Sequence, residues 1–323
     1  MRLKDLGERG LITRIRRRGA GSGAGVVMGI GDDAALVRGP EKLLITTDLL
    51  IEDVDFRRAL HPPRLLGRKA LSVNLSDIAA MGGRPLHAVL GLAMPGTTEL
   101  AWIEAFLGGF REAGRRWGVA LVGGDLSAAR QVVIAVTVTG RATSVVPRSG
   151  ARPGDILFVS GRLGEAAEGR KLLETGHKPG ERGGAGRLLK AFLDPTPRLK
   201  LGAALAKRKI ASAMIDLSDG LSVDLSHICA ESVVGAEVDL GRIPMSSALR
   251  RYSKDPLDAA LNGGEDFELL FTVGPRNVGR ALALAKKFML TEIGRITKNK
   301  RILAIGPDGK KRPLKIRGYE HFK

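Results

Sequence analysis

Acidic residues recur at glycine-rich segments and strand ends along this chain of 323 residues. Two adjacent aspartates end Gly29-Ile-Gly-Asp-Asp33, and another ends the apolar run Ile45-Thr-Thr-Asp48. Further acid-bearing segments are Asn74-Leu-Ser-Asp77, Gly123-Gly-Asp125 and Ile215-Asp-Leu-Ser-Asp-Gly220. Neighbouring carboxylates repel one another unless a cation lies between them. Oxygen ligands suit hard cations, so several Mg²⁺ ions bound together with nucleotide phosphates are the expected chemistry.

Several of these segments also have a plainer interpretation. Gly29–Asp33 is compatible with a tight turn that carries two solvated acids, and Asp77 with a helix-end acid that faces water. Gly123-Gly-Asp125 after an apolar strand is a common hairpin turn. The functional interpretation of the first segment gains from Gly21-Ser-Gly-Ala-Gly25 just upstream, because a glycine-rich arm suits a lid over a metal-bound phosphate.

The segment Asp216-Leu-Ser-Asp-Gly220 is more specific. A short strand ends at Asp216, and Ser218 stands where the N-cap of the following helix is expected. Free backbone N–H groups at that helix end would bind a phosphate, while Asp216 and Asp219 would hold its Mg²⁺. Plain capping explains Ser218 but not the two acids. Asn262-Gly-Gly-Glu-Asp-Phe-Glu268 again places acids behind paired glycines at the start of a strand.

The elements that would position these acids mix strands and helices without strict alternation, which favours an α+β fold. We expect a strand at 42–50 and a helix at 63–81, with Asn74 and Asp77 on one helix face. The turn-rich stretch 146–154 marks a domain boundary. We therefore expect an N-terminal α/β domain at 1–145 and a C-terminal α+β domain at 146–323.

Composition limits the possible classes of function. A formal charge of +18 would suit a nucleic-acid binder, but only 4% of residues are aromatic, so stacking platforms are scarce. Hydrophobic residues make up 44% of the sequence, and no apolar run is long enough to span a membrane. We therefore expect a cytoplasmic enzyme. The lone Cys229 excludes an internal disulfide. No phosphate-binding loop with G-x-x-x-x-G-K-[ST] occurs, and the histidines lack metal-type spacing.

Taken together, the motifs resemble the thiamine-monophosphate kinase family, of the superfamily typified by aminoimidazole ribonucleotide synthetase. The resemblance extends from Leu6-Gly-Glu-Arg-Gly-Leu-Ile12 to Gly318-Tyr-Glu-His-Phe322. The matching blocks, in order, are GIGDDAA, ITTD, ALSVNLSDIAAMG, GGD, RSGARPGD, IDLSDGL and GGEDFEL. The resemblance implies phosphoryl transfer from ATP to thiamine monophosphate, giving thiamine diphosphate. It also implies a homodimer in which the N-terminal domains pair their sheets into a shared β-barrel.

The resemblance further implies roles for individual residues. It implies Mg²⁺ ligands at Asp33, Thr46, Thr47, Asp48, Asp77, Asp125, Asp216 and Asp219. It implies ATP contacts at Gly124, Asp125, Arg148 and Ser218, and substrate contacts at Glu265, Tyr319 and the position of Asp55. Relatives usually have His at that last position, whereas this chain reads Val54-Asp55-Phe56.

No general base is assigned, because a phosphate monoester has a second pKa of about 6 and is mostly deprotonated near neutral pH. The acids therefore have charge and positioning roles. Two alternatives remain open at this point: another ATP-using enzyme of the same superfamily, such as a purine-pathway synthetase, and a non-catalytic nucleotide or nucleic-acid binder.

Overall fold

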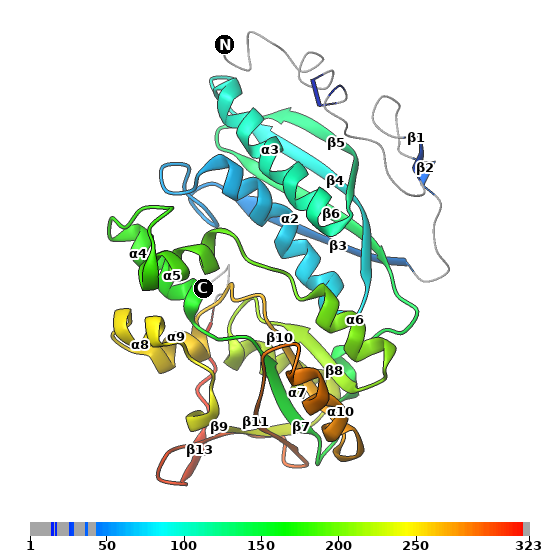
Figure 1. Ribbon diagram of the computed structural model, residues 1–323, viewed down its shortest axis with the longest axis vertical. Helices are drawn as coiled ribbons and strands as arrows, with labels where there is room; N and C mark the ends of the chain where they lie inside the picture. Colours follow the sequence, from blue (N-terminus) through cyan, green and yellow to red (C-terminus); the bar gives the residue numbers. More distant parts are fainter. Residues whose placement is uncertain (1–13, 16, 18–25, 29–35, 38–42, 319–323) are drawn as a thin grey trace. The chain divides into compact units, whose positions relative to one another are not determined.

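The computed structural model describes residues 14–15, 17, 26–28, 36–37 and 43–318 (Figure 1). The predicted metal ligand Asp33 and the predicted substrate contact Tyr319 lie outside these residues. The chain divides into two compact units. Unit 1 comprises 1–78 and 84–142, and unit 2 comprises 79–83 and 143–323. Both units combine helices with sheets, which confirms the predicted α+β class.

Unit 1 is built on a four-stranded sheet in the order β3-β6-β4-β5. Its strands are β3 (Leu43–Ile51), β6 (Val133–Arg141), β4 (Arg84–Met94) and β5 (Ala120–Ala128). β6 pairs antiparallel with both of its neighbours, whereas β4 and β5 are parallel. Figure 1 shows α2 (Pro63–Ala80) and α3 (Leu100–Trp117) along one face of this sheet. A separate pair is formed by β1 (Val26–Met28) and β2 (Leu36–Val37).

The helices of unit 1 follow from the sequence pattern. The α3 helix buries one stripe of side chains that includes Ile103, Phe106 and Phe110, as an amphipathic sequence predicts. It ends at Gly118, whose φ of 70° is a left-handed conformation that glycine adopts without strain. The expected helix at 63–81 corresponds to α2 (Pro63–Ala80).

One expectation for unit 1 is wrong. Gly123-Gly-Asp125 does not form a turn, because these residues lie inside β5. The physical reason is the close approach of β5 to β4. A Cβ added at Gly124 would lie 1.9 Å from the Leu90 carbonyl oxygen. Glycine is therefore required here to let two parallel strands approach, and not to reverse the chain.

Unit 2 contains a seven-stranded mixed sheet in the order β13-β12-β9-β11-β7-β10-β8. β12 and β9 are parallel, and the other described pairs are antiparallel. Its strands are β7 (Ile156–Ser160), β8 (Ala211–Asp216), β9 (Gly235–Asp239), β10 (Leu269–Val273), β11 (Leu290–Thr297), β12 (Ile302–Ile305) and β13 (Lys311–Pro313). At its centre, Phe158 and Phe271 stack with ring centroids 5.6 Å apart.

Helices flank this sheet. They are α4 (Glu165–Glu174), α5 (Gly183–Leu193), α6 (Leu199–Lys207), α7 (Leu221–Ser232), α8 (Ser247–Tyr252), α9 (Pro256–Asn262) and α10 (Val278–Ala285), with short 3₁₀ turns η1 (Arg148–Gly150), η2 (Leu240–Arg242) and η3 (Pro275–Asn277). Within the described part of the chain, no helix is long and apolar enough to cross a membrane.

Candidate active site

In unit 1, two adjacent elements bring three predicted metal ligands together. Side chains alternate along β3, so Thr46 and Asp48 share one face of the sheet. Asp77 on α2 meets that face, where the Thr46 hydroxyl donates a hydrogen bond of 2.5 Å to its Oδ2. We call Thr46, Asp48 and Asp77 the unit 1 acid cluster.

The electrostatics of the unit 1 acid cluster fit a bound cation. Burial and the neighbouring charge of Asp77 raise the pKa of Asp48 to about 7. A cation between the two carboxylates would offset both effects and restore the ionised form. The donors are carboxylate and hydroxyl oxygens, which are the ligands that Mg²⁺ prefers.

Two other predicted ligands of unit 1 lie elsewhere on the sheet. The Thr47 side chain points to the opposite face, where its hydroxyl lies 3.0 Å from that of Thr137. Asp125 and Gly124 are exposed on β5, the edge strand farthest from β3. Three strand spacings separate these edges, which is about 14 Å along the sheet. Within one copy of unit 1, the sheet does not bring Asp125 to the unit 1 acid cluster.

Asp55, at the position where relatives usually have His, has a local structural contact. Its Oδ2 accepts a 2.8 Å hydrogen bond from the Ile51 backbone N–H, and its own N–H donates to the Ile51 carbonyl at 2.8 Å. The carboxylate therefore closes the turn that follows β3. This contact alone is sufficient to explain a short acceptor side chain at this position.

In unit 2, the end of β8 and the loop that leads to α7 carry three predicted site residues. Asp216 is buried at the end of β8, and Ser218 and Asp219 follow it. The expectation that Ser218 caps α7 is wrong, because the N-cap position is Gly220. The buried Asp224 reaches back from the first turn and accepts the N–H groups of Asp219 and Gly220 at 3.2 and 3.1 Å. Because Asp224, a residue of α7, binds these N–H groups, the Ser218 hydroxyl is not needed to cap the helix.

Asp224 was missed by sequence reasoning, although it completes a group of acids. Burial and the charges of Asp216 and Asp219 raise the pKa of Asp224 to about 8. Ligand atoms of Asp219, Asp224 and His227 all lie within 4.8 Å of one another. Asp224 and His227 are three residues apart on α7, and this helical spacing was the available signal. The acids here again fit a cation.

The buried Cys229 on the same helix is unsuited to nucleophilic chemistry, because burial raises the pKa of its thiol to about 12.

The predicted substrate contact Glu265 lies against the same loop. Its backbone N–H donates to the Ser218 carbonyl at 2.8 Å, and the Phe267 N–H donates to Leu217 at 2.8 Å. Gly318, the last described residue before Tyr319, is also adjacent, since a Cβ added there would lie 2.6 Å from the Asp219 carbonyl oxygen. The structure thus assembles ATP-type, metal-type and substrate-type candidates around one loop of unit 2.

The Glu265 segment is strained. Glu265 has φ 68° and Phe267 has φ 48°, both in the left-handed region that glycine favours. Such a conformation costs roughly 1–3 kcal/mol per residue and persists only when its surroundings enforce it. Strain of this kind is concentrated at functional sites, which supports a role for Glu265.

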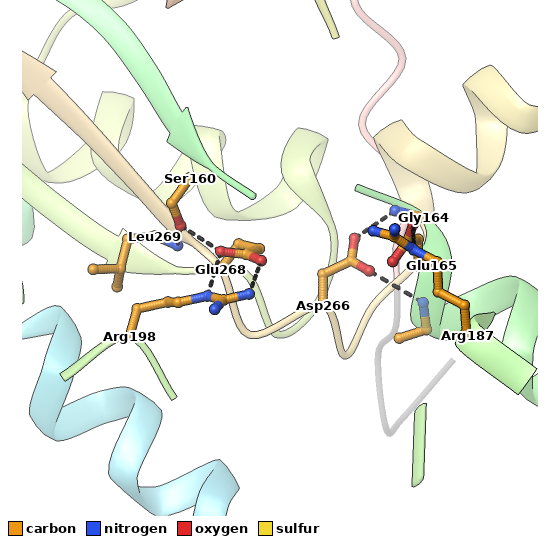
Figure 2. Close-up of polar contacts among 9 residues, drawn as sticks. Ser160, Gly164, Glu165, Arg187, Arg198, Asp266, Glu268 and Leu269 are labelled. Carbon is orange, nitrogen blue, oxygen red and sulfur yellow. Dashed lines mark hydrogen bonds and ion pairs between the residues drawn. The ribbon is translucent and has the colours of Figure 1, made fainter. Parts of the chain in front are cut away.

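Two buried acids hold this segment in place (Figure 2). The Asp266 carboxylate accepts the backbone N–H groups of Gly164 and Ala166 at 2.6 and 3.2 Å. Burial raises the pKa of Asp266 to about 8 despite these donors. Glu268 forms a two-pronged ion pair with Arg198 and accepts a hydrogen bond from the Ser160 hydroxyl. Burial raises the pKa of Glu268, while Arg198 and Ser160 oppose that effect.

Arg148, a predicted ATP contact, lies in η1 with an exposed side chain. Its carbonyl accepts a 3.0 Å hydrogen bond from Ser232, and the preceding Pro147 accepts one from Met214 at 3.2 Å. Arg148 therefore sits beside the outer edge of β8, near Met214, two residues before Asp216.

Comparison with known proteins identifies the family. Residues 31–142 match the AIR synthase related protein N-terminal domain, and residues 152–305 match its C-terminal domain. The thiamine-monophosphate kinase of Escherichia coli (strain K12) is 39% identical over 330 residues, covering 98% of this chain and 98% of the relative. The chain therefore belongs to the AIR synthase related protein family.

Solved structures of thiamine-monophosphate kinases are also similar to this chain. The thiamine-monophosphate kinase of Stenotrophomonas maltophilia K279a has a TM-score of 0.83 and 38% identity, covering 94% of this chain and 96% of that one. AaThiL complexed with AMPPCP and TMP has a TM-score of 0.80 and 35% identity, covering 100% and 99%. The resemblance to thiamine-monophosphate kinases seen in the sequence is thereby confirmed.

Proposed function

We propose that this protein transfers the γ-phosphoryl group of ATP to thiamine monophosphate, giving thiamine diphosphate and ADP. The observation that carries the proposal is similarity over nearly the whole chain to thiamine-monophosphate kinases, one of them complexed with an ATP analogue and TMP. The grouping of Asp216, Ser218, Asp219 and Glu265 around one loop of unit 2 supports it.

Charge is the main obstacle to this reaction, since two anions must approach in line. We propose that Mg²⁺ is held by Thr46, Asp48 and Asp77 in unit 1 and by Asp216 and Asp219 in unit 2, with Asp33, Thr47 and Asp125 as further ligands. When bound, the ions would neutralise phosphate charge in the ground and transition states. Ser218, Gly124, Asp125 and Arg148 would contact ATP, with Arg148 supplying a fixed positive charge.

The acceptor needs little help from the protein to become a nucleophile. Its phosphate is mostly dianionic near neutral pH, so no side chain has to remove a proton during transfer. The thiamine part carries a cationic thiazolium ring, and a carboxylate such as Glu265 would attract it. Tyr319 and Asp55 are proposed as the other substrate contacts.

The direct test is incubation of the purified protein with ATP, Mg²⁺ and thiamine monophosphate, followed by chromatography of the products. We expect thiamine diphosphate and ADP in equal amounts. Parallel reactions with thiamine and with unrelated phosphomonoesters establish the acceptor. Hydrolysis of ATP without a new diphosphate, or transfer only to another acceptor, would refute the proposal.

The role of Asp55 can be separated from its local hydrogen bond. Asp55→Asn keeps an oxygen that can accept the Ile51 N–H but removes the charge, whereas Asp55→His restores the residue usual in relatives. If the carboxylate contacts the substrate, both variants should change KM for thiamine monophosphate by about threefold or more, with KM for ATP altered by less than about twofold. Steady-state kinetics in which each substrate is varied while the other is saturating measure both constants. Unchanged constants in both variants would mean that Asp55 only closes the turn.

We also propose that the protein is a cytoplasmic homodimer in which the N-terminal domains, 1–145, pair their sheets into a shared barrel. This domain would bind metal and nucleotide, with 146–323 as the second domain.

The dimer proposal is supported by the sheet face opposite the unit 1 acid cluster. Leu43, Ile45 and Leu49 on β3 are 47%, 66% and 57% exposed. Val89 on β4 shares this face, because it and Thr47 both pair with Thr137. Exposed apolar side chains gathered on one face of a sheet are typical of an interface.

Ile45→Arg is expected to convert the dimer to a monomer, because it would place two charges inside the paired faces. Leu282→Arg on α10 is the matched control, since Leu282 is similarly exposed at 51% but belongs to unit 2. Light scattering after gel filtration measures the mass of each variant. A dimeric Ile45→Arg protein would exclude this face as the interface.

A further inference from the structure

The segment Gly263–Phe267 joins α9 to β10 and holds Glu265 in an unfavourable backbone conformation. Both Glu265, with φ 68°, and Phe267, with φ 48°, adopt the left-handed region. Asp266 lies between them and is the residue through which the segment is anchored to another part of unit 2. The inference below rests on the proposed function, because it assigns a role relative to Glu265 as a substrate contact.

The anchor is a long-range pair of hydrogen bonds. Asp266 Oδ2 accepts the Gly164 N–H at 2.6 Å, and Oδ1 accepts the Ala166 N–H at 3.2 Å (Figure 2). Both carboxylate oxygens are therefore used, each by a different backbone donor at the start of α4. Because each of its two oxygens is held by a different backbone N–H group, the Asp266 side chain resists rotation about its Cα–Cβ and Cβ–Cγ bonds.

The receiving end of the anchor is itself fixed. Gly164 has φ 82°, and a Cβ added there would lie 2.7 Å from the Ala260 nitrogen. The start of α4 thus packs directly against α9, the helix that leads into the Gly263–Phe267 segment. The segment is held at its beginning by α9 and at Asp266 by α4, so the two attachments together restrict the peptide that carries Glu265.

On the other side, the segment contacts the loop that contains Ser218. The Glu265 N–H donates to the Ser218 carbonyl at 2.8 Å, and the Leu217 N–H donates to the Glu268 carbonyl at 2.8 Å. There is little room between them, since a Cβ added at Gly264 would lie 2.5 Å from the Ser218 carbonyl oxygen. Release of the Asp266 anchor would leave these contacts with the Ser218 loop in place, but the peptide that follows Glu265 would lose its two bonds to α4.

We propose that Asp266 is a positioning residue that holds the Glu265 backbone in its left-handed conformation and thereby directs the Glu265 carboxylate to the substrate. A simpler role is that Asp266 only caps α4, whose own N-cap residue, Gly164, has no side chain. The two roles differ in outcome. Loss of a cap lowers stability, whereas loss of positioning weakens binding of thiamine monophosphate specifically.

The test is Asp266→Asn, which has nearly the same volume but offers an NH₂ group to one of the two N–H donors. We expect KM for thiamine monophosphate to rise about tenfold, with KM for ATP changed by less than about twofold. Ser246→Ala is the matched control, because Ser246 caps α8 in the same unit through the Leu249 N–H at 3.0 Å. It should lower the unfolding temperature without a change in either KM.

A second variant, Gly264→Ala, displaces the segment from Ser218 without touching Asp266 and should show the same selective rise in KM. It keeps the test decisive if Asp266→Asn does not fold. Wild-type protein is assayed first, since an inactive wild type would overturn the proposed function together with this inference. An active wild type with unchanged KM for thiamine monophosphate in the folded variants would overturn the positioning role alone.

Discussion

Asp77→Asn is expected to lower Mg²⁺-dependent phosphoryl transfer by about 100-fold or more while the protein stays folded. An Asn side chain can still accept the hydrogen bond from the Thr46 hydroxyl, which is 2.5 Å long in the wild type. What it loses is a negative charge beside Asp48. The cluster would then attract a divalent cation far less strongly, and the charge of the approaching phosphates would be less well neutralised.

Without Mg²⁺, the Asp77→Asn substitution should not destabilise the protein. Burial and the charge of Asp77 together raise the pKa of Asp48 to about 7. Asp77→Asn removes that charge, so the pKa of Asp48 should fall. Relief of the repulsion makes the variant at least as stable as the wild type in EDTA. Thermal unfolding with and without Mg²⁺ should show stabilisation by Mg²⁺ in the wild type and a reduced effect in the variant.

Asp53→Asn is the matched control for this experiment. Asp53 is exposed in the same unit, and Asn tolerates its φ of 66°. We expect near wild-type turnover and an unchanged response to Mg²⁺. Near-normal product formation by Asp77→Asn would remove Asp77 from the proposed metal site.

Part of the unit 1 acid cluster was predictable from local patterns. Alternation along β3 places Thr46 and Asp48 on one face, and helical spacing places Asp77 on one face of α2. That these two faces meet depends on how α2 packs on the sheet, which no local pattern specifies. The resemblance to a family supplied that grouping, whereas spacing alone left a solvated Asp77 as an equal alternative.

Paired glycines were ambiguous for a physical reason. Glycine serves both for chain reversal and for close approach of two backbones, and the sequence does not distinguish these uses. At Gly124 the deciding partner is the Leu90 carbonyl, on a strand that is distant in sequence. The residues expected to form a turn therefore lie within β5.

Capping in unit 2 shows the same limit. Ser218 is a suitable N-cap by residue type, but α7 begins at Leu221 and Asp224 binds the N–H groups of the preceding loop. Asp266 acts over a still longer range, since its donor Gly164 is 102 residues away. Such contacts become visible only once the strands and helices of the unit are assembled.

The largest stability effect is expected from Arg198→Ala, about 3 kcal/mol in the free energy of unfolding near pH 8. Glu268 is buried, with 5% of its side chain exposed, and would lose its ion-pair partner while keeping the Ser160 hydrogen bond. The estimate is at the low end for a broken buried pair because 36% of the Arg198 side chain is exposed.

The deficit should depend on pH in a defined direction. Burial already raises the pKa of Glu268, and Arg198 opposes that rise, so the variant has a still higher folded-state pKa. Above the unfolded value of about 4.3, the folded variant binds more protons than the unfolded chain, and its stability falls as pH rises. Urea unfolding should therefore give a larger deficit at pH 8 than at pH 5.

Two further variants test whether the loss of stability in Arg198→Ala comes from the burial of an unpaired Glu268 carboxylate. Arg64 forms an ion pair with Glu112 through the same two nitrogen atoms, but 65% of the Arg64 side chain is exposed, so Arg64→Ala should cost much less at either pH. Glu268→Gln combined with Arg198→Ala removes the unpaired charge and should recover much of the loss and abolish its pH dependence. If the single and double variants are equally unstable, lost packing of the Arg198 side chain, and not an uncompensated carboxylate, is the cause.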